Sequence, residues 1–184
     1  MLTSDHALLA ETGDSWFSTM NLKLPHGCQY EIQMQYGSIG WSVGATLGLQ
    51  IALGGKKRVV ACIGDGSFQM GAQELSTMIR YNCTPILFLM NNGAYTIEVE
   101  IHDGPYNVIN PWKYSQLVEV FRGENKDAWS KKVQNIQQLK EAISMAKDHK
   151  GLCLIEVMLE KDDCNKDLLS WGGRVAAYNG RLPR

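Results

Sequence analysis

The hydrophobic positions along the chain fall into two kinds of segment, and the two kinds alternate. Short apolar runs bounded by glycine, proline or charged residues predict buried strands. The predicted strands cover residues 7–10, 30–35, 59–63, 86–90 and 152–159. Longer segments with apolar residues three or four positions apart predict helices with one buried face. The predicted helices cover residues 41–53, 67–81, 114–121, 136–147 and 166–177.

This alternation predicts the fold class. Strands that alternate with helices favour a parallel sheet covered on both sides, so we expect a single doubly wound α/β domain over residues 1–184. The sheet should be mostly parallel, with helices on both faces. Residues 102–112 hold two prolines and predict a loop, and the polar residues 178–184 predict a frayed end.

Composition and charge narrow the function classes. The net charge of −1 gives no electrostatic reason to expect nucleic acid or an anionic membrane as a partner. No apolar run approaches the roughly 20 residues of a membrane span, and the first ten residues lack the form of a signal peptide. The five cysteines include no C-x-x-C pair, so we interpret them as reduced thiols. Together these features favour a cytoplasmic protein.

Polar residues follow two of the predicted strands. Gly64-Asp65-Gly66-Ser67 comes directly after residues 59–63, and Asn91-Asn92 comes directly after residues 86–90. Carboxyl ends of parallel strands meet at one edge of the sheet, where open α/β sheets bind ligands. Carboxylate and amide oxygens are ligands that Mg²⁺ prefers. The sequence therefore predicts a magnesium site at this edge, with a phosphorylated ligand.

Two further glycine-bearing junctions are expected at the same edge. They are Thr12-Gly13-Asp14 and Gly37-Ser38-Ile39-Gly40, each between a predicted strand and a helix. Glycine lets the backbone approach a ligand closely, and a following helix N-terminus offers amide donors. Three such junctions around a magnesium ion could hold a diphosphate.

These motifs resemble those of the thiamine-diphosphate enzymes. The wider sequence resembles the pyruvate decarboxylase family in its plant-like form, over nearly the whole chain. The resemblance is carried by residues 11–17 (ETGDSWF), 36–41 (YGSIGW), 64–69 (GDGSFQ) and 95–107 (YTIEVEIHDGPYN). It covers only the C-terminal, diphosphate-binding domain of that family. The N-terminal pyrimidine-binding domain and the middle domain are absent from this sequence.

The resemblance implies a role for individual residues. Asp65, Asn92 and the backbone carbonyl of Ala94 would bind Mg²⁺, although the family pattern has glycine where Ala94 stands. Glu98 would be the acid/base carboxylate. Thiamine diphosphate would be held by the remaining predicted residues: Thr12, Gly13, Asp14, Gly37, Ile39, Gly64, Gly66, Ser67 and Ile97. Among these, Ile39 would bend the cofactor, the Gly37 carbonyl would accept a hydrogen bond from its amino group, and Ile97 would line the pocket.

The implied activity is non-oxidative decarboxylation of a 2-oxo acid, pyruvate to acetaldehyde and carbon dioxide. It would need thiamine diphosphate, Mg²⁺ and a pyrimidine-binding domain from the same or another chain, in a homo-oligomeric full-length enzyme. The chain alone should have little or no activity. Three alternatives stay open: a subunit of a split thiamine-diphosphate enzyme, a non-catalytic fragment that pairs with and modulates full-length subunits, and a truncated product with no function.

Several of these residues also fit a purely structural role. Residues 11–15 could be only a capped turn, Ile39 a core residue and Glu98 a solvated carboxylate at the start of a helix. His102-Asp103-Gly104 could be only a loop turn, and we assign His102 no role. Gly71 lies inside the predicted helix 67–81, where glycine costs about 1 kcal/mol relative to alanine.

Overall fold

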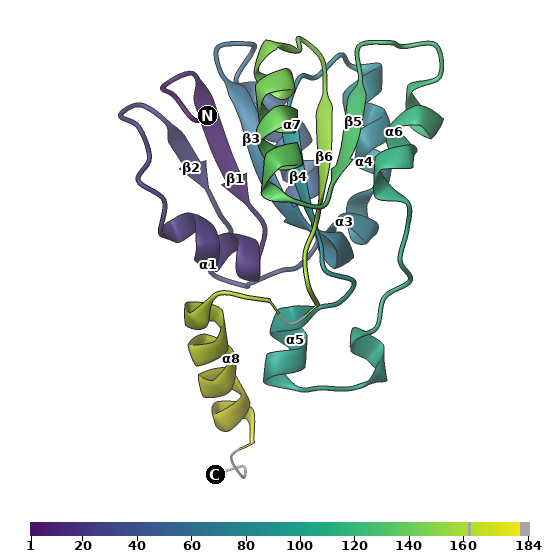
Figure 1. Ribbon diagram of the computed structural model, residues 1–184. Coiled ribbons are helices and arrows are strands. Elements are labelled where there is room, and N and C mark those ends of the chain that lie inside the picture. The colour runs from purple at the N-terminus through teal and green to yellow at the C-terminus, as the bar shows by residue number, and fades with distance from the viewer. Residues whose placement is uncertain (162, 181–184) are drawn as a thin grey trace.

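A six-stranded parallel sheet forms the centre of the computed structural model, which describes residues 1–161 and 163–180 (Figure 1). Within these residues the strand order is β2-β1-β3-β4-β6-β5, and every neighbouring pair is parallel. The strands are β1 (His6–Ala10), β2 (Gln29–Glu31), β3 (Arg58–Gly64), β4 (Ile86–Asn91), β5 (Trp129–Val133) and β6 (Cys153–Met158). The predicted doubly wound α/β fold is therefore confirmed.

Helices cover both faces of the sheet. They are α1 (Asp14–Met20), α2 (Ser42–Ala52), α3 (Asp65–Gly71), α4 (Gln73–Arg80), α5 (Thr96–Ile101), α6 (Tyr114–Arg122), α7 (Ile136–Asp148) and α8 (Lys166–Asn179), with a 3₁₀ turn at Pro105–Asn107. Successive strand residues point to opposite faces. Leu9 accordingly packs with Val43 and Leu75 under α2 and α4, whereas Leu8 packs in the core that α7 covers with Ala142.

Three helices lie at or beyond the carboxyl edge of the sheet, where α5 and α8 extend away from it (Figure 1). A small apolar cluster joins them: Trp16 and Phe17 of α1, Ile97 of α5 and Leu168 of α8. Helix α8 crosses α5 closely, because a Cβ at Gly172 would come within 2.9 Å of the Glu100 Cβ. This cluster builds one wall of the space beyond the carboxyl edge.

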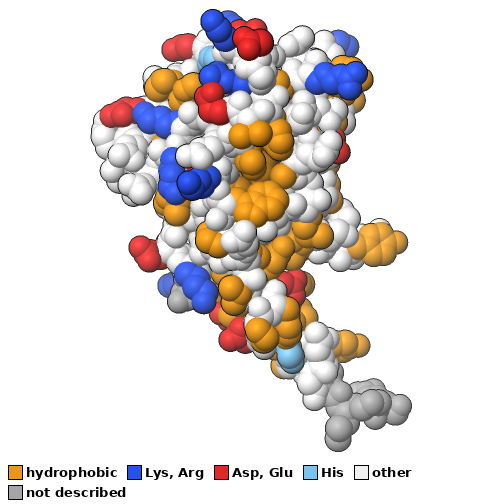
Figure 2. All heavy atoms as spheres, turned by 90° about the vertical axis from the view of Figure 1, so that its right-hand side faces the viewer, with side chains coloured by type: hydrophobic (Ala, Val, Ile, Leu, Met, Phe, Trp, Pro, Cys, Tyr) orange, Lys and Arg blue, Asp and Glu red, His pale blue; other side chains and the backbone are white. Residues whose placement is uncertain are grey.

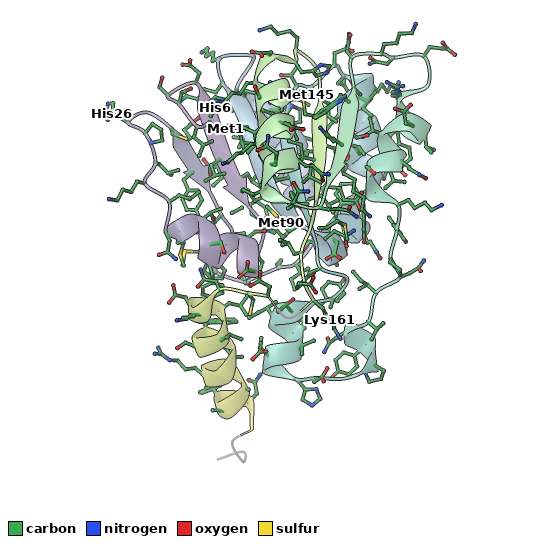
Figure 3. The ribbon with its side chains drawn as sticks, in the orientation of Figure 1. Met1, His6, His26, Met90, Met145 and Lys161 are labelled. Carbon is green, nitrogen blue, oxygen red and sulfur yellow. The ribbon has the colours of Figure 1, made fainter. Side chains whose placement is uncertain are left out.

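The strand order places a topological switch point between β1 and β3. From β1 the chain adds β2 on one side, and then crosses to add β3 on the other. Crevices at such points are where open α/β sheets bind ligands. Met90 lies near this carboxyl edge, and His6 and Met145 lie toward the opposite end of the molecule (Figure 3).

Two predicted elements have different bounds in the structure. The strand expected over 30–35 is only Gln29–Glu31, because its neighbour β1 pairs with it from Ala7 to Leu9 and ends at Ala10. The helix expected over 67–81 is two helices that meet at Ala72. The first of them begins at Asp65, two residues before the expected start.

One strand was missed by the sequence analysis. Strand β5 (Trp129–Val133) is an edge strand, and its centre is Ser130, Lys131 and Lys132. Lysines on an edge strand discourage pairing with other chains, but they also remove the apolar signal that predicts strands. At the chain's end, α8 continues to Asn179, and residues 181–184 of the tail expected to fray lie outside the described residues.

The surface retains hydrophobic side chains. Figure 2 shows them gathered along the middle of the face on the β5 side of the sheet. On the whole described surface, Tyr36 is 80% exposed and Val120 is 70% exposed. Across residues 1–161 and 163–180, no helix combines the length and apolar character that crossing a membrane would require.

Candidate functional site

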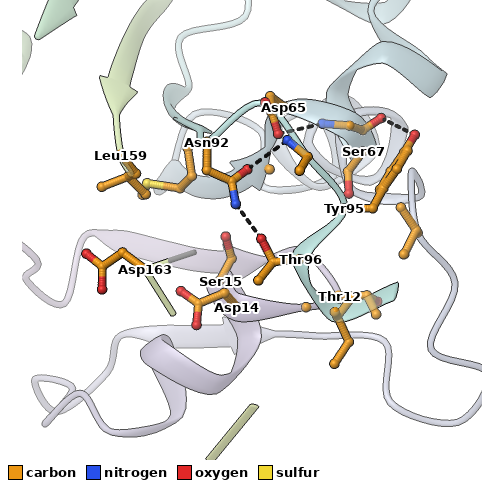
Figure 4. A pocket seen from close by; sticks show the side chains of 17 residues that line it. Thr12, Asp14, Ser15, Asp65, Ser67, Asn92, Tyr95, Thr96, Leu159 and Asp163 are labelled. Atoms are coloured by element: carbon orange, nitrogen blue, oxygen red, sulfur yellow. Dashed lines mark hydrogen bonds between the residues drawn. The ribbon is translucent and has the colours of Figure 1, made fainter. Parts of the chain in front are cut away.

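A pocket lies at the switch point, against the carboxyl ends of β1, β3 and β4 (Figure 4). Eleven of the thirteen predicted site residues line it. They are Thr12, Gly13, Asp14, Ile39, Gly64, Asp65, Gly66, Ser67, Asn92, Ala94 and Ile97. The fold therefore brings together turns that lie up to 85 positions apart in the sequence (97 − 12 = 85).

Three oxygen atoms converge in this pocket. In the structure the Asn92 amide oxygen lies 3.0 Å from the Ala94 carbonyl oxygen and 3.2 Å from Asp65 Oδ1. Oxygens this close repel one another unless a proton or a cation lies between them. Neighbouring ligands of an octahedral Mg²⁺ ion, each about 2.1 Å from the metal, are separated by about 3.0 Å. The two oxygen–oxygen distances therefore fit neighbouring ligands of one octahedral Mg²⁺ ion.

The orientation of the Asn92 amide distinguishes the metal-free and the metal-bound arrangement. Without a cation, rotating the amide would let its nitrogen donate to Asp65 and Ala94, and let its oxygen accept from Thr96 Oγ1. With a cation, the oxygen must face Asp65 and Ala94, which is the orientation present here, and the nitrogen faces Thr96 Oγ1 at 2.5 Å. Bound Mg²⁺ therefore requires the amide oxygen to face Asp65 and Ala94, whereas a site without a cation favours the rotated amide.

Asp65 is a buried anion without a counter-charge. It is 1% exposed, and its two carboxylate oxygens accept only backbone bonds, from Gly66 N at 2.9 Å and Gly93 N at 2.7 Å. No lysine or arginine in the described part of the chain forms an ion pair with it. Burial raises the pKa of Asp65, and the nearby Glu156 adds to this, against the lowering effect of the backbone bonds. A bound divalent cation would supply the missing positive charge.

Gly66 lets the chain pass directly under an aromatic ring. A Cβ at Gly66 would lie 2.4 Å from the Tyr95 ring, and the Tyr95 hydroxyl donates to the Gly66 carbonyl at 3.1 Å. The residue after Asn92 is also a required glycine, because Gly93 has a φ of +74° and directs its N–H to Asp65. These two contacts hold the Asp65 turn and the Asn92 turn against each other.

The other two predicted residues, Gly37 and Glu98, line an adjacent hollow. This hollow shares Thr12, Gly13 and Ile97 with the main pocket, so the two spaces adjoin. Thr12 also donates from its hydroxyl to the Ser38 carbonyl at 2.8 Å, which ties the two loops together. Glu98 is half-buried on α5 and faces a third hollow that it shares with Ile39 and Tyr95.

Asp14 differs from the expectation in how its side chain is used. Its carboxylate accepts from Asn165 N at 2.7 Å and from Ser18 Oγ at 3.2 Å. The side chain therefore connects α1 to the start of α8. No sequence pattern predicts this contact, since Asn165 lies 151 positions away.

Sequence reasoning missed two residues that shape the site. Tyr95 directly follows Ala94, and its ring lies against Gly66 only because of the fold. Glu11 precedes the Thr12 turn and is 0% exposed, where its carboxylate bonds to backbone on both sides of the pocket. A glutamate at a strand end is usually solvated, so its burial could not be read from the sequence.

Comparison with known proteins assigns this fold and pocket to a family. Residues 11–157 match the profile described as "Thiamine pyrophosphate enzyme, C-terminal TPP binding domain". The chain therefore belongs to the thiamine pyrophosphate enzyme family, as its C-terminal cofactor-binding domain. The cofactor of this family is thiamine diphosphate with a divalent metal, usually Mg²⁺.

The particular relatives are plant enzymes. The chain is 60% identical to pyruvate decarboxylase 2 of Oryza sativa subsp. japonica over 185 residues, which is 100% of this chain and 30% of the rice protein. It is 58% identical to pyruvate decarboxylase 2 of Pisum sativum, over 100% of this chain and 45% of that protein. The chain thus spans less than half the length of these relatives, and the predicted resemblance to their C-terminal domain is confirmed.

A solved structure supports the fold independently. A thiamine diphosphate-dependent 4-hydroxybenzoylformate decarboxylase of Rhodococcus jostii RHA1 superimposes with a TM-score of 0.72 at 21% identity. The match covers 85% of this chain and 30% of that one. At this identity it shows that the fold is shared.

Proposed function

We propose that this chain anchors the diphosphate of thiamine diphosphate through Mg²⁺, bound by the side chains of Asp65 and Asn92 and the carbonyl of Ala94. The observation that carries the proposal is the convergence of these three oxygens at 3.0 and 3.2 Å beside a buried, unpaired carboxylate. Alanine in place of the family's glycine keeps the carbonyl ligand, because the Ala94 carbonyl oxygen lies 3.0 Å from the Asn92 amide oxygen. Diphosphate oxygens and water would complete the coordination.

Backbone groups at two helix starts would receive the diphosphate. Helix α1 begins after Gly13 and helix α3 begins after Gly64, and neither glycine has a side chain that could cap the first turn. Backbone N–H groups at a helix start and the positive end of the helix dipole favour an anion. Thr12, Asp14 (through its backbone), Gly66 and Ser67 would complete the cradle.

The activity we propose is decarboxylation of a 2-oxo acid, with pyruvate as substrate and acetaldehyde and carbon dioxide as products. Bound thiamine diphosphate supplies the electron sink that lets such an acid lose carbon dioxide. Glu98 would deliver or accept a proton at the substrate, with Ile97 shaping the same wall. Ile39 would hold the cofactor in a bent shape, and the Gly37 carbonyl would accept a hydrogen bond from the amino group of the cofactor.

The chain would act as one half of a composite site, in a cytoplasmic enzyme. We propose that a pyrimidine-binding domain, from the same or another chain of a homo-oligomer, covers the open side of the pocket. Apolar side chains on that side support this partner. Met34, Tyr36 and Trp171 line the hollow beside Glu98, and are 57%, 80% and 39% exposed.

The test is calorimetric titration of thiamine diphosphate into the chain, with Mg²⁺ and with EDTA. We expect binding only with Mg²⁺, and no measurable binding to Asp65→Ala because that variant lacks the charged ligand. Glu98→Ala is the matched control, since it removes a carboxylate from the adjacent hollow without touching the three oxygens. Normal binding to Asp65→Ala would show that the metal assignment is wrong.

A further inference from the structure

Glu11 is a buried carboxylate that joins two of the loops around the cofactor pocket. It is 0% exposed at the end of β1. Its Oε1 accepts from Thr12 N at 2.8 Å, in the turn before α1. Its Oε2 accepts from Gly40 N at 3.3 Å, Ser42 N at 3.2 Å and Ser42 Oγ at 2.5 Å, in the loop before α2.

The bonding pattern suits an ionised carboxylate. Three of its four partners are backbone N–H groups, which can only donate, and the fourth is a hydroxyl. No lysine or arginine in the described part of the chain pairs with Glu11. Burying an unpaired anion is costly, and its donors would in turn be left unsatisfied without it. Glu11 therefore sets the position of the N–H groups that donate to it, and Gln33 adds a bond of its own to the same loop by accepting from Ser38 N at 2.9 Å.

The geometry that Glu11 fixes is the path of residues 37–42. Gly37 and Gly40 have φ values of +58° and +91°, so the loop turns sharply on both sides of Ile39. On its other side the loop is packed tightly, because a Cβ at Gly40 would lie 2.7 Å from the Met70 Cβ on α3. The Thr12 hydroxyl adds one bond, to Ser38 O. In the described part of the chain, the other hydrogen bonds from residues 6–12 to this loop all come from Glu11.

We propose that Glu11 is the positioning residue that sets Gly37 and Ile39 for the thiamine end of the cofactor. This inference rests on the proposed function, in which those two residues contact thiamine and the Asp65 turn holds the diphosphate. Glu11 has no bond to Asp65, Asn92 or Ala94, and three of its four bonds go to the loop that holds Gly37 and Ile39, so its effect should fall mainly on the thiamine end. Its removal should therefore change selectivity between two ligands that share a diphosphate.

The experiment compares thiamine diphosphate with inorganic pyrophosphate, both titrated into the full chain by calorimetry in excess Mg²⁺. Glu11→Gln keeps the size of the side chain but places a donor against at least one N–H group. We expect this substitution to weaken the binding of thiamine diphosphate about tenfold more than the binding of pyrophosphate, a difference of about 1.4 kcal/mol. Ser42→Ala removes a single donor and keeps the carboxylate, so it should shift the ratio in the same direction by less.

The matched control is Gln50→Leu. Gln50 is buried at the other end of α2, where it bonds to Val59 N at 3.0 Å and Lys57 O at 3.0 Å, so its loss should destabilise the fold without touching the pocket. We expect this variant to have a lower melting temperature than the wild type and to keep the wild-type ratio of the two affinities. If the ratio of the two affinities shifts as much in Gln50→Leu as in Glu11→Gln, general destabilisation explains the effect of Glu11, and the inference is overturned.

Two other outcomes separate the inference from the proposed function. A wild-type chain that binds neither ligand overturns the proposed function and the inference with it. A wild-type chain that binds both, with the same ratio in Glu11→Gln and Ser42→Ala, overturns the inference alone. If Glu11→Gln does not fold, the ratio measured with Ser42→Ala decides.

Discussion

Gly66 is the residue at which the pocket leaves no room for a side chain. Gly66→Ala would push a Cβ into the Tyr95 ring, which lies 2.4 Å from that position, and would displace the hydroxyl from the Gly66 carbonyl. We expect a loss of about 1–3 kcal/mol in the free energy of unfolding, measured by urea denaturation.

Gly48→Ala is the control for that substitution. Gly48 lies inside α2 with open space around its missing Cβ, so alanine should stabilise the helix by about 1 kcal/mol. Equal effects of the two alanines on stability would contradict the close contact between Gly66 and Tyr95.

The charge of Glu11 should be visible in the pH dependence of stability. Burial raises the pKa of Glu11 above its ordinary 4.5, against the lowering effect of its hydrogen bonds. Between pH 4.5 and the raised value the folded chain holds more proton than the unfolded chain, so this residue's contribution to stability falls as pH rises. The melting temperature of Glu11→Gln minus that of the wild type should therefore increase with pH across this window. A difference that is flat or decreases would show that the pKa is not raised.

Asp65, Asn92 and Ala94 could be placed from the sequence because each lies just past a strand with a strong apolar signal. Parallel strands bring such positions to one edge whatever the details of packing. The contacts of Glu11 and Tyr95 could not be predicted in this way. Glu11 meets partners 29 and 31 positions along the chain, and Tyr95 meets Gly66, also 29 positions away. Only the folded loops define those distances.

At the scale of elements, Leu168 is the one large apolar residue of α8 that is fully buried, and Trp171 packs beside it on Trp16 and Phe17. Leu168 is 0% exposed in the cluster with Trp16 and Ile97, and the neighbouring Leu169 is 41% exposed. Leu168→Ala should lower the free energy of unfolding by about 2–5 kcal/mol and speed amide hydrogen exchange in α8. Leu169→Ala, one position on, should change stability by less than about 0.5 kcal/mol. Similar losses in both variants would contradict the packing of α8 on α1 and α5.

The elements that the sequence predicted well are those buried on both faces. Strands β3, β4 and β6 form the centre of the sheet, where continuous apolar runs are required. Among the strands, the errors fall on the two edge strands, β2 and β5, which have one neighbour each and keep a polar composition. Edge strands depend on pairing rather than on burial, so their bounds follow from the neighbour's length and not from their own residues.

At the scale of the whole molecule, the site is open on the side where the exposed aromatic residues lie. We predict that the chain alone, saturated with thiamine diphosphate and Mg²⁺, releases no acetaldehyde from pyruvate above background in a coupled dehydrogenase assay. Turnover by the unaided chain would contradict the proposal of a composite site.

In an assembly completed by a pyrimidine-binding domain, Glu98→Gln should spare cofactor binding and lower kcat.

The claim on which the rest depends is that Asp65, Asn92 and Ala94 hold a magnesium ion. The most direct measurement is a high-resolution crystal structure of the chain with Mg²⁺ and thiamine diphosphate. The account predicts one ion about 2.1 Å from the Asp65 carboxylate, the Asn92 amide oxygen and the Ala94 carbonyl, with the Asn92 nitrogen facing Thr96. An ion held by other residues, or an Asn92 amide whose nitrogen faces Asp65 beside bound cofactor, would contradict it.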